Sequence, residues 1–198
     1  SRLVIRDGQT LNIEDGGSVG FAWSRVGRNT AAFVNMSGNG SFLMNNDDLY
    51  IGLENGYCEW TMSDSSSIVI NVDADDGEEL YIGEDGGTGL FTLIGSNVTV
   101  NVDRIRFTAN NPGGTAVMKF VLDAGGASTI ACQRSYIGEA GDAHLMLSTI
   151  AQSPAEDIVL VNATSSYDIG GTGVFNTLNG GPAAEGTLLV LGGNVYSL

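Results

Sequence analysis

A glycine-anchored repeat runs through most of this 198-residue chain. Three copies begin with the same tripeptide, at Tyr50-Ile51-Gly52, Tyr81-Ile82-Gly83 and Tyr136-Ile137-Gly138, and each leads into an acidic, glycine-rich turn and an apolar run. Two degenerate copies, Arg25-Val26-Gly27 and Arg106-Phe107-Thr108, fill the gaps and give a spacing of 25 to 31 residues. Self-similarity at this spacing indicates stacked structural units.

Each repeat reads as three short strands. Apolar and polar residues alternate in runs such as Val69 to Val72 and Val98 to Val102, and Gly, Asn and Asp bound these runs. This pattern is typical of half-buried strands joined by tight turns. Three strands and three corners make about one coil of a parallel β-helix, a unit that must stack on neighbours to bury its apolar face. We therefore expect an all-β fold, a single-stranded right-handed parallel β-helix of about seven short coils. A β-sandwich is the alternative.

The domain organisation follows from the extent of the repeat. We expect one β-solenoid domain over residues 1–198, with N-terminal capping strands in 1–24, repeats in 25–150 and C-terminal coils in 151–198. The chain opens directly into a strand-like segment, so any leader is expected to have been removed or to lie upstream.

Alignment on the anchors predicts which side chains share a column. The position before the anchor is always bulky and apolar, as an inward column requires: Val26, Ile51, Ile82, Phe107 and Ile137. Side chains alternate across a strand, so the columns two and four residues before the anchor should face outward. The first outward column reads Arg25, Tyr50, Tyr81, Arg106, Tyr136, and the second reads Trp23, Asp48, Glu79, Arg104, Arg134. Glu79 and Arg104 should therefore form a favourable pair across adjacent coils.

The charge balance limits the partners. The formal net charge is −15, and polyanions repel such a chain, which argues against nucleic acid and anionic membrane surfaces. No stretch is long and apolar enough to span a bilayer, so we expect no membrane insertion. The acidity leaves room for divalent cations.

One stretch carries a family resemblance. Leu80 to Leu93 (LYIGEDGGTGLFTL) resembles the autotransporter- and PEP-CTERM-associated repeat of secreted bacterial proteins, and the segments 48–62 and 134–147 resemble it more loosely. The segments 170–178 and 191–198 resemble the closing part of the passenger regions in that family. The resemblance implies export, a β-solenoid fold and a place at the bacterial cell surface or in the extracellular matrix. It also implies that the precursor continues past Leu198 into a sorting or anchoring segment. It supplies no catalytic residues.

Two motifs in the sequence bear on metal binding. Gly-Gly-x-Gly occurs twice, but a calcium-binding nonapeptide repeat needs an Asp where this chain has Phe91 and Phe175. Turn formation explains these glycines better. The densest carboxylate cluster contains Asp73, Asp75 and Asp76. A loose Ca²⁺ site there is one interpretation, and a solvated acidic loop between two coils is the other. Otherwise we expect no cofactor.

Catalysis finds little support in the sequence. His144 is the sole histidine, which rules out His-pair metal sites and favours ordinary strand packing for this residue. Arg104, Arg106 and Arg134 could serve a polysaccharide lyase, but ion pairing between coils explains them with fewer assumptions. We therefore expect no enzyme.

The outward column Tyr50, Tyr81, Arg106 and Tyr136 is the candidate binding surface. Stacked tyrosines can hold sugar rings, with an arginine between them, but an aromatic ladder that stabilises the coils explains the same residues. The leading hypothesis is a non-enzymatic extracellular or cell-surface module, acting as spacer, adhesin or matrix component. Its partners would be polysaccharides or other surface proteins, and end-to-end self-association is a plausible extension because a solenoid exposes strand edges. A carbohydrate-binding module and a lyase-like β-helix are the alternatives.

The two cysteines, Cys58 and Cys132, fall in different parts of the repeat. Buried free thiols are the simpler expectation, and a disulfide is the alternative.

Overall fold

A computed structural model describes the chain from Ser1 to Ser197 with gaps. The described residues are 1–45, 47–70, 78–94, 97–107, 113–122, 128–132, 134–137, 142–149, 165–169, 175–176, 186–189 and 194–197. From residue 120 onward the description covers the backbone together with the side chain of Ile130. These residues form strands, and none of their segments is a helix long and apolar enough to cross a membrane.

The described strands form three parallel seven-stranded sheets, and each sheet takes every third strand. Sheet A contains β1 (Arg2–Ile5), β4 (Trp23–Arg28), β7 (Leu49–Leu53), β10 (Glu79–Glu84), β13 (Arg104–Phe107), β16 (Arg134–Ile137) and β19 (Phe175–Asn176). Sheet B contains β2 (Gln9–Ile13), β5 (Ala31–Met36), β8 (Tyr57–Met62), β11 (Thr88–Ile94), β14 (Thr115–Leu122), β17 (Asp142–Thr149) and β20 (Gly186–Leu189). Sheet C contains β3 (Ser18–Phe21), β6 (Ser41–Met44), β9 (Ser67–Ile70), β12 (Val98–Asn101), β15 (Ser128–Cys132), β18 (Ser165–Ile169) and β21 (Asn194–Ser197).

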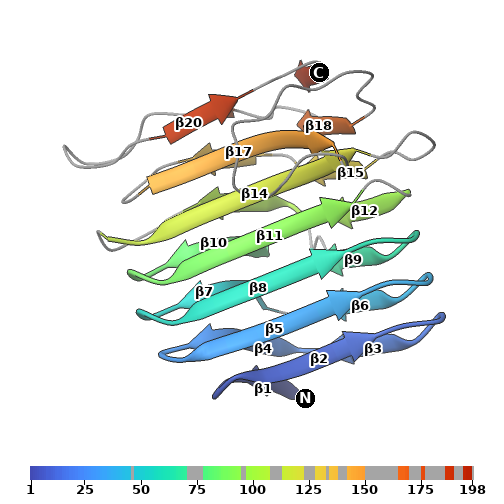
Figure 1. Ribbon diagram of the computed structural model, residues 1–198, viewed down its shortest axis with the longest axis vertical. Helices are drawn as coiled ribbons and strands as arrows, with labels where there is room; N and C mark the ends of the chain where they lie inside the picture. Colours follow the sequence, from blue (N-terminus) through green and yellow to red (C-terminus); the bar gives the residue numbers. More distant parts are fainter. Residues whose placement is uncertain are drawn as a thin grey trace.

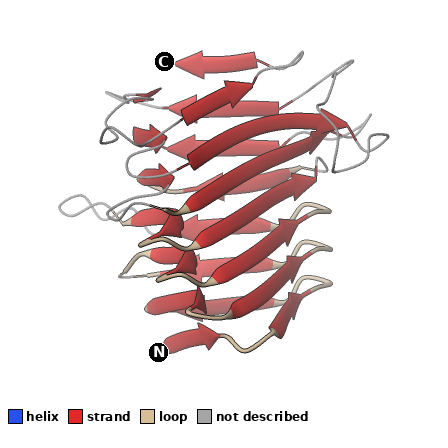
Figure 2. Ribbon diagram, turned by 60° about the vertical axis from the view of Figure 1, so that its left-hand side comes forward, coloured by secondary structure: helices blue, strands red, loops and turns tan. Residues whose placement is uncertain are grey.

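The chain visits sheets A, B and C in turn and then returns to sheet A one level higher (Figure 1). Seen from the side, the coils lie one above another with the N-terminus at one end of the stack (Figure 2). This arrangement is consistent with a parallel β-helix, as the repeat predicts. A β-sandwich, the alternative, would pair its strands antiparallel in two sheets, whereas the described strand pairs are parallel.

The inward column before the anchors is confirmed. Val26 pairs with Ile51, Ile51 with Ile82, Ile82 with Phe107 and Phe107 with Ile137 in successive strands of sheet A. The first four of these side chains are fully buried. They belong to one apolar core that runs along the stack and includes Trp60, whose ring meets Phe42 edge-on at 5.1 Å between centroids.

The anchor glycines owe their identity to backbone geometry and to the neighbouring coil. Gly27, Gly52 and Gly83 all have φ between +71° and +74°, a region that side chains with a Cβ rarely adopt. A Cβ on Gly52 would also overlap the carbonyl of Thr88, and one on Gly83 would overlap the carbonyl of Thr115. The Ile-Gly step therefore turns the chain from sheet A into sheet B where two backbones lie very close.

Polar side chains form ladders where they face solvent. Asn35 donates to Asn12 at 3.0 Å, and the hydroxyl of Ser41 donates to that of Ser18 at 2.8 Å. Identical side chains in neighbouring coils are thus linked to each other by hydrogen bonds from one coil to the next.

Cys58 lies in sheet B, fully buried and with a free thiol, which confirms the expectation for this cysteine. The side chain of Cys132, in β15 of sheet C, lies outside the described residues.

Candidate functional site

The outward face of sheet A carries the predicted tyrosine column. Tyr50 pairs with Tyr81, Tyr81 with Arg106 and Arg106 with Tyr136, so the four residues are in register on β7, β10, β13 and β16. The rings of Tyr50 and Tyr81 stack with their centroids 5.0 Å apart and 13° between their planes. The side chain of Tyr136 lies outside the described residues, so for this residue the backbone register alone is established.

The stack covers one face of each of the two tyrosine rings and engages the Tyr50 hydroxyl. Parallel rings at this distance cover one face of each other, and the hydroxyl of Tyr50 donates to Asp48 Oδ2 at 3.2 Å. Burial and the neighbouring carboxylate of Asp48 raise the pKa of Tyr50, and burial and Glu79 raise that of Tyr81. Both phenols therefore stay protonated and serve as hydrogen-bond donors in the ladder.

Glu79 and Arg104 of the second outward column form a compact ion-pair cluster with Arg106. Arg104 Nη1 lies 2.9 Å from Glu79 Oε1, which confirms the pairing predicted from the repeat. Arg106 Nε lies 2.5 Å from Glu79 Oε2, so this arginine leaves its own column to bind the same carboxylate. Glu79 is only 6% exposed although it lies on the outer face. The guanidinium of Arg106, which the sequence suggested as a sugar contact, is thus engaged in an ion pair.

The pKa values of the two acids in this column, Glu79 and Asp48, are shifted in opposite directions. Burial opposes ionisation of Glu79, but hydrogen bonds from Tyr81, Arg104 and Arg106 outweigh it, and the pKa of Glu79 is lowered. Asp48 lacks an arginine partner among these contacts, and burial raises its pKa even though its Oδ1 accepts the backbone N–H of Glu79 at 2.7 Å. The cluster therefore holds one firmly ionised carboxylate and one that gains a proton more readily.

At the N-terminal end of the same face, two arginines lie against an aromatic ring and, among the described residues, not against a carboxylate. The guanidinium carbon of Arg25 lies 4.7 Å from the ring centroid of Trp23, and that of Arg2 lies 5.2 Å from it. A cavity of about 720 Å³ opens beside these three residues and is also lined by Arg28 and Asp47. The sequence analysis placed Trp23 and Arg25 in the outward columns without singling them out. Arg2 was missed because the first coil lacks an anchor glycine, and the register with Trp23 reveals it.

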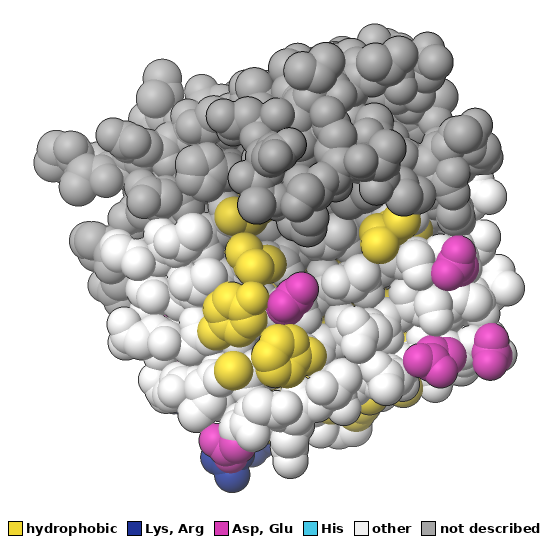
Figure 3. Space-filling model, viewed as in Figure 1, with side chains coloured by type: hydrophobic (Ala, Val, Ile, Leu, Met, Phe, Trp, Pro, Cys, Tyr) yellow, Lys and Arg dark blue, Asp and Glu magenta, His cyan; other side chains and the backbone are white. Residues whose placement is uncertain are grey.

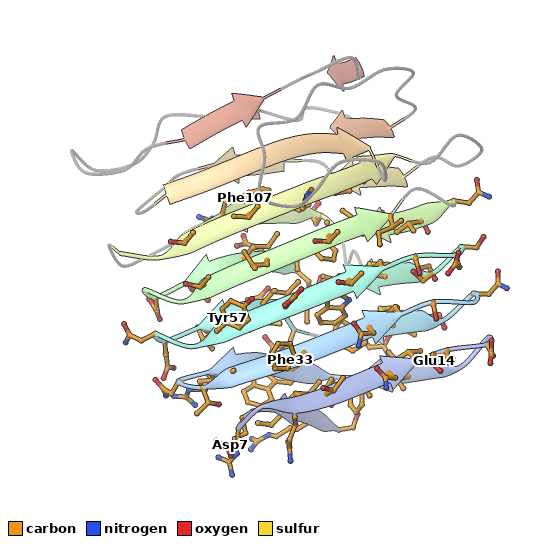
Figure 4. All side chains as sticks on the ribbon, viewed as in Figure 1. Asp7, Glu14, Phe33, Tyr57 and Phe107 are labelled. Atoms are coloured by element: carbon orange, nitrogen blue, oxygen red, sulfur yellow. The ribbon has the colours of Figure 1, made fainter. Side chains whose placement is uncertain are left out.

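Sheet B presents a different surface. Apolar side chains gather over its outer face (Figure 3), and the half-buried residues there include Phe33, Tyr57, Leu90 and Val117. Phe33 and Tyr57 come from neighbouring strands and meet edge-on, 6.2 Å between centroids (Figure 4). The hydroxyl of Tyr57 donates to Glu59 Oε2 at 3.3 Å, so this stripe also contains a partly satisfied polar group.

The remaining candidates from the sequence are not brought into a site. Asp73, Asp75 and Asp76 lie outside the described residues. No group of three or more His, Cys, Asp or Glu that could hold a metal occurs among the residues that are described. The backbone of His144 aligns with Val117 in sheet B and that of Arg134 with Arg104 in sheet A, while both side chains lie outside the description.

These features were compared with known proteins: no protein-family model, no curated protein sequence and no solved structure matches this chain.

Proposed function

We propose that this chain is a single-stranded, right-handed parallel β-helix that acts as a non-enzymatic module at the bacterial cell surface or in the extracellular matrix. Parallel strand connections within a sheet are almost always right-handed, which supports the handedness. As a stack of like units, the module would serve as a spacer, an adhesin or a component of a filament. The repeat resemblance supports export.

The observation that carries this proposal is that outward side chains of β7, β10 and β13 in sheet A are used for contacts between coils. Glu79 binds the arginines of the next strand, Tyr50 stacks on Tyr81, and the core below them is continuous and apolar. A catalytic site needs groups that reach substrate, whereas these charged groups bind each other. The geometry therefore favours a structural role over acid–base chemistry.

Self-association fits the N-terminal end of the stack. β1, β2 and β3 each occupy the edge of their sheet in the described strand order. Leu3, Leu11, Val19 and Phe21 pack against the core from this end and stay partly exposed. A second copy that adds a strand layer here would satisfy the free backbone groups and cover these side chains.

A variant pair tests the assembly role. Val19→Lys places a charge on the exposed end of the core, while Gly20→Lys places the same charge on the outward side of the same strand, where a Cβ meets only one atom at 3.9 Å. We expect the wild type and Gly20→Lys to grow in mass with concentration in light scattering and to form rods in electron micrographs. Val19→Lys should remain monomeric. Wild-type protein that stays monomeric at high concentration would remove the filament role.

Two further assays separate the alternatives. A lyase would release unsaturated products from uronate polymers, detectable by ultraviolet absorbance, and we expect none with or without Ca²⁺. A carbohydrate-binding module that uses the tyrosine column would bind polysaccharide less tightly after Tyr81→Ala. Because both rings are committed to the stack, we expect glycan binding to be unchanged in that variant.

A further inference from the structure

Positive charge is concentrated at one end of this acidic protein. Four of the eight basic residues lie on the first two coils, in a chain whose net charge is −15: Arg2, Arg6, Arg25 and Arg28. All four line one of two adjoining cavities, of about 720 and 340 Å³, on the outer face of sheet A. Trp23, Arg25 and Arg28 line both cavities, so they form the wall between them.

Two of these arginines have no ion-pair partner among the described residues. Among the described residues, neither Arg2 nor Arg25 has a carboxylate within ion-pair distance, whereas Arg28 lies 2.7 Å from Glu54 and Arg6 lies 3.4 Å from Asp7. The Nε–H of Arg25 is buried and has no hydrogen-bond acceptor within the described part of the chain. Buried charged donors are normally hydrogen-bonded, and this one has no such bond. An anion bound at the terminal nitrogens of the guanidinium would leave the Nε–H as it is, but it would stabilise the positive charge electrostatically.

The ring of Trp23 explains how both arginines are held in place without an ion pair among the described residues. A guanidinium that lies against an aromatic ring is attracted by the ring and keeps its N–H groups free. Arg2 and Arg25 both contact Trp23 in this way, from the two neighbouring strands β1 and β4. The contact therefore fixes two forked donors beside the cavity without using any of their hydrogen bonds.

We propose that this cavity, which we call the Trp23 site, binds an acidic sugar unit through its carboxylate. Arg2 and Arg25 would bind the carboxylate, because a guanidinium fork matches its two oxygens. The volume suits a ligand of one or two sugar rings, far larger than an inorganic ion. Asp47 on the wall can accept hydrogen bonds from sugar hydroxyls and favours a monoanion over a phosphate dianion. This site is separate from the tyrosine column and does not depend on the module being a filament.

The test is calorimetric titration of the intact chain with oligogalacturonate, with the neutral galactose oligosaccharide and with inorganic phosphate. We expect binding of the uronate alone. Arg25→Gln should weaken it about tenfold or more, the scale expected when a charge-assisted hydrogen bond is lost. Arg2→Gln should weaken it as well. Lys119→Gln, which removes one positive charge from sheet B, should bind like the wild type.

Folding is checked in parallel, because a variant that unfolds would lose binding for a trivial reason. Arg25 is half-exposed, so Arg25→Gln is expected to keep the wild-type circular dichroism spectrum and melting temperature. Arg25→Lys, which keeps the charge but loses the fork, provides a second folded variant and should also bind weakly. Equal uronate binding in the wild type and both Arg25 variants would overturn the proposal. So would absence of uronate binding, or equally tight binding of phosphate or of the neutral sugar.

Discussion

Arg106 crosses from its own column to bind Glu79, with its Nε 2.5 Å from Glu79 Oε2, while Arg104 holds the other carboxylate oxygen at 2.9 Å. One carboxylate on β10 thus binds two arginines of β13. The charges of these three side chains bind one another, whereas Arg2 and Arg25 at the N-terminal coils have no ion-pair partner among the described residues.

The pH dependence of stability should carry the signature of Glu79. Its pKa in the folded protein lies below the ordinary value of 4.5, so the folded state binds this proton less readily than the unfolded chain does. The stabilisation is fully present above the ordinary value and is lost as the pH falls through the lowered folded pKa. We expect Glu79→Gln to be less stable than the wild type at pH 7 and to lose less stability on acidification, as measured by urea denaturation from pH 7 to pH 3.

Asp48 should contribute a pH dependence of stability that is opposite in sign to that of Glu79. Its raised pKa means that the folded state binds this proton more tightly, so ionised Asp48 costs stability at neutral pH and the cost disappears in acid. Asp48→Asn, which keeps an acceptor for the N–H of Glu79, should therefore gain relative to the wild type at neutral pH and lose this advantage at low pH. Identical pH profiles for the two variants would contradict this assignment.

The anchor glycines should be far less replaceable than glycines in open corners. Gly52 and Gly8 have nearly equal φ values of +74° and +75°, but a Cβ on Gly52 would overlap the next coil whereas one on Gly8 meets nothing within 4 Å. We expect Gly8→Ala to cost about 1 kcal/mol, from backbone strain alone. Gly52→Ala should cost about 4 kcal/mol or more, because the coils must separate. Denaturant melts of the two variants measure the difference, and equal costs would show that packing between coils is not the constraint.

Ser24 should be better replaced by an apolar residue. It is fully buried at an inward position, in register with Leu49, and its hydroxyl has no hydrogen-bond partner among the described residues. Removing an unsatisfied buried hydroxyl relieves its desolvation cost, so Ser24→Ala should stabilise the protein by about 1 kcal/mol. Ser41→Ala is the control, because that exposed hydroxyl is bonded to Ser18 and its loss should bring no gain. A lower melting temperature for Ser24→Ala would show that this hydroxyl has a partner in solution.

Cys58 should be inert while the protein is folded. Burial in the core raises the pKa of this thiol, so neither access nor thiolate is available to a thiol reagent. We expect the native-state labelling rate to be the same in the wild type and in Cys58→Ser. After unfolding in urea, the wild type should react at one more thiol per chain than Cys58→Ser does. A slower native rate in Cys58→Ser would mean that this strand opens readily.

The sequence predicted the register well because its cues are local and periodic. A glycine at positive φ marks the same corner at Gly27, Gly52 and Gly83, so aligning these residues also aligns the columns beside them. The degenerate copy that ends at Thr108 extends the alignment to Glu79 and Arg104. The contact of Arg106 with Glu79 was not predicted, because an alignment by columns compares residues within one column and does not consider contacts between columns.

The Trp23 site was missed for a related reason. The first coil has Arg6 where the next two coils have Gly27 and Gly52, so nothing in the repeat aligned Arg2 with Trp23 or Val4 with Arg25. The burial of Glu79 also could not be predicted from the alternation of side chains. It depends on contacts among three long side chains. A strand pattern predicts which face a side chain lies on, but it does not predict which neighbours the side chain contacts.

The matching corners have a consequence for how such a chain can change in length. Ile51-Gly52 and Ile82-Gly83 occupy equivalent corners of adjacent coils. Joining Ile51 directly to Gly83 would therefore delete one complete turn of the stack and keep the flanking strands in register. Whole turns can then be deleted or duplicated as modules, while insertion of a partial turn would shift every layer above it. Growth by complete turns would lengthen the protein and leave its cross-section unchanged.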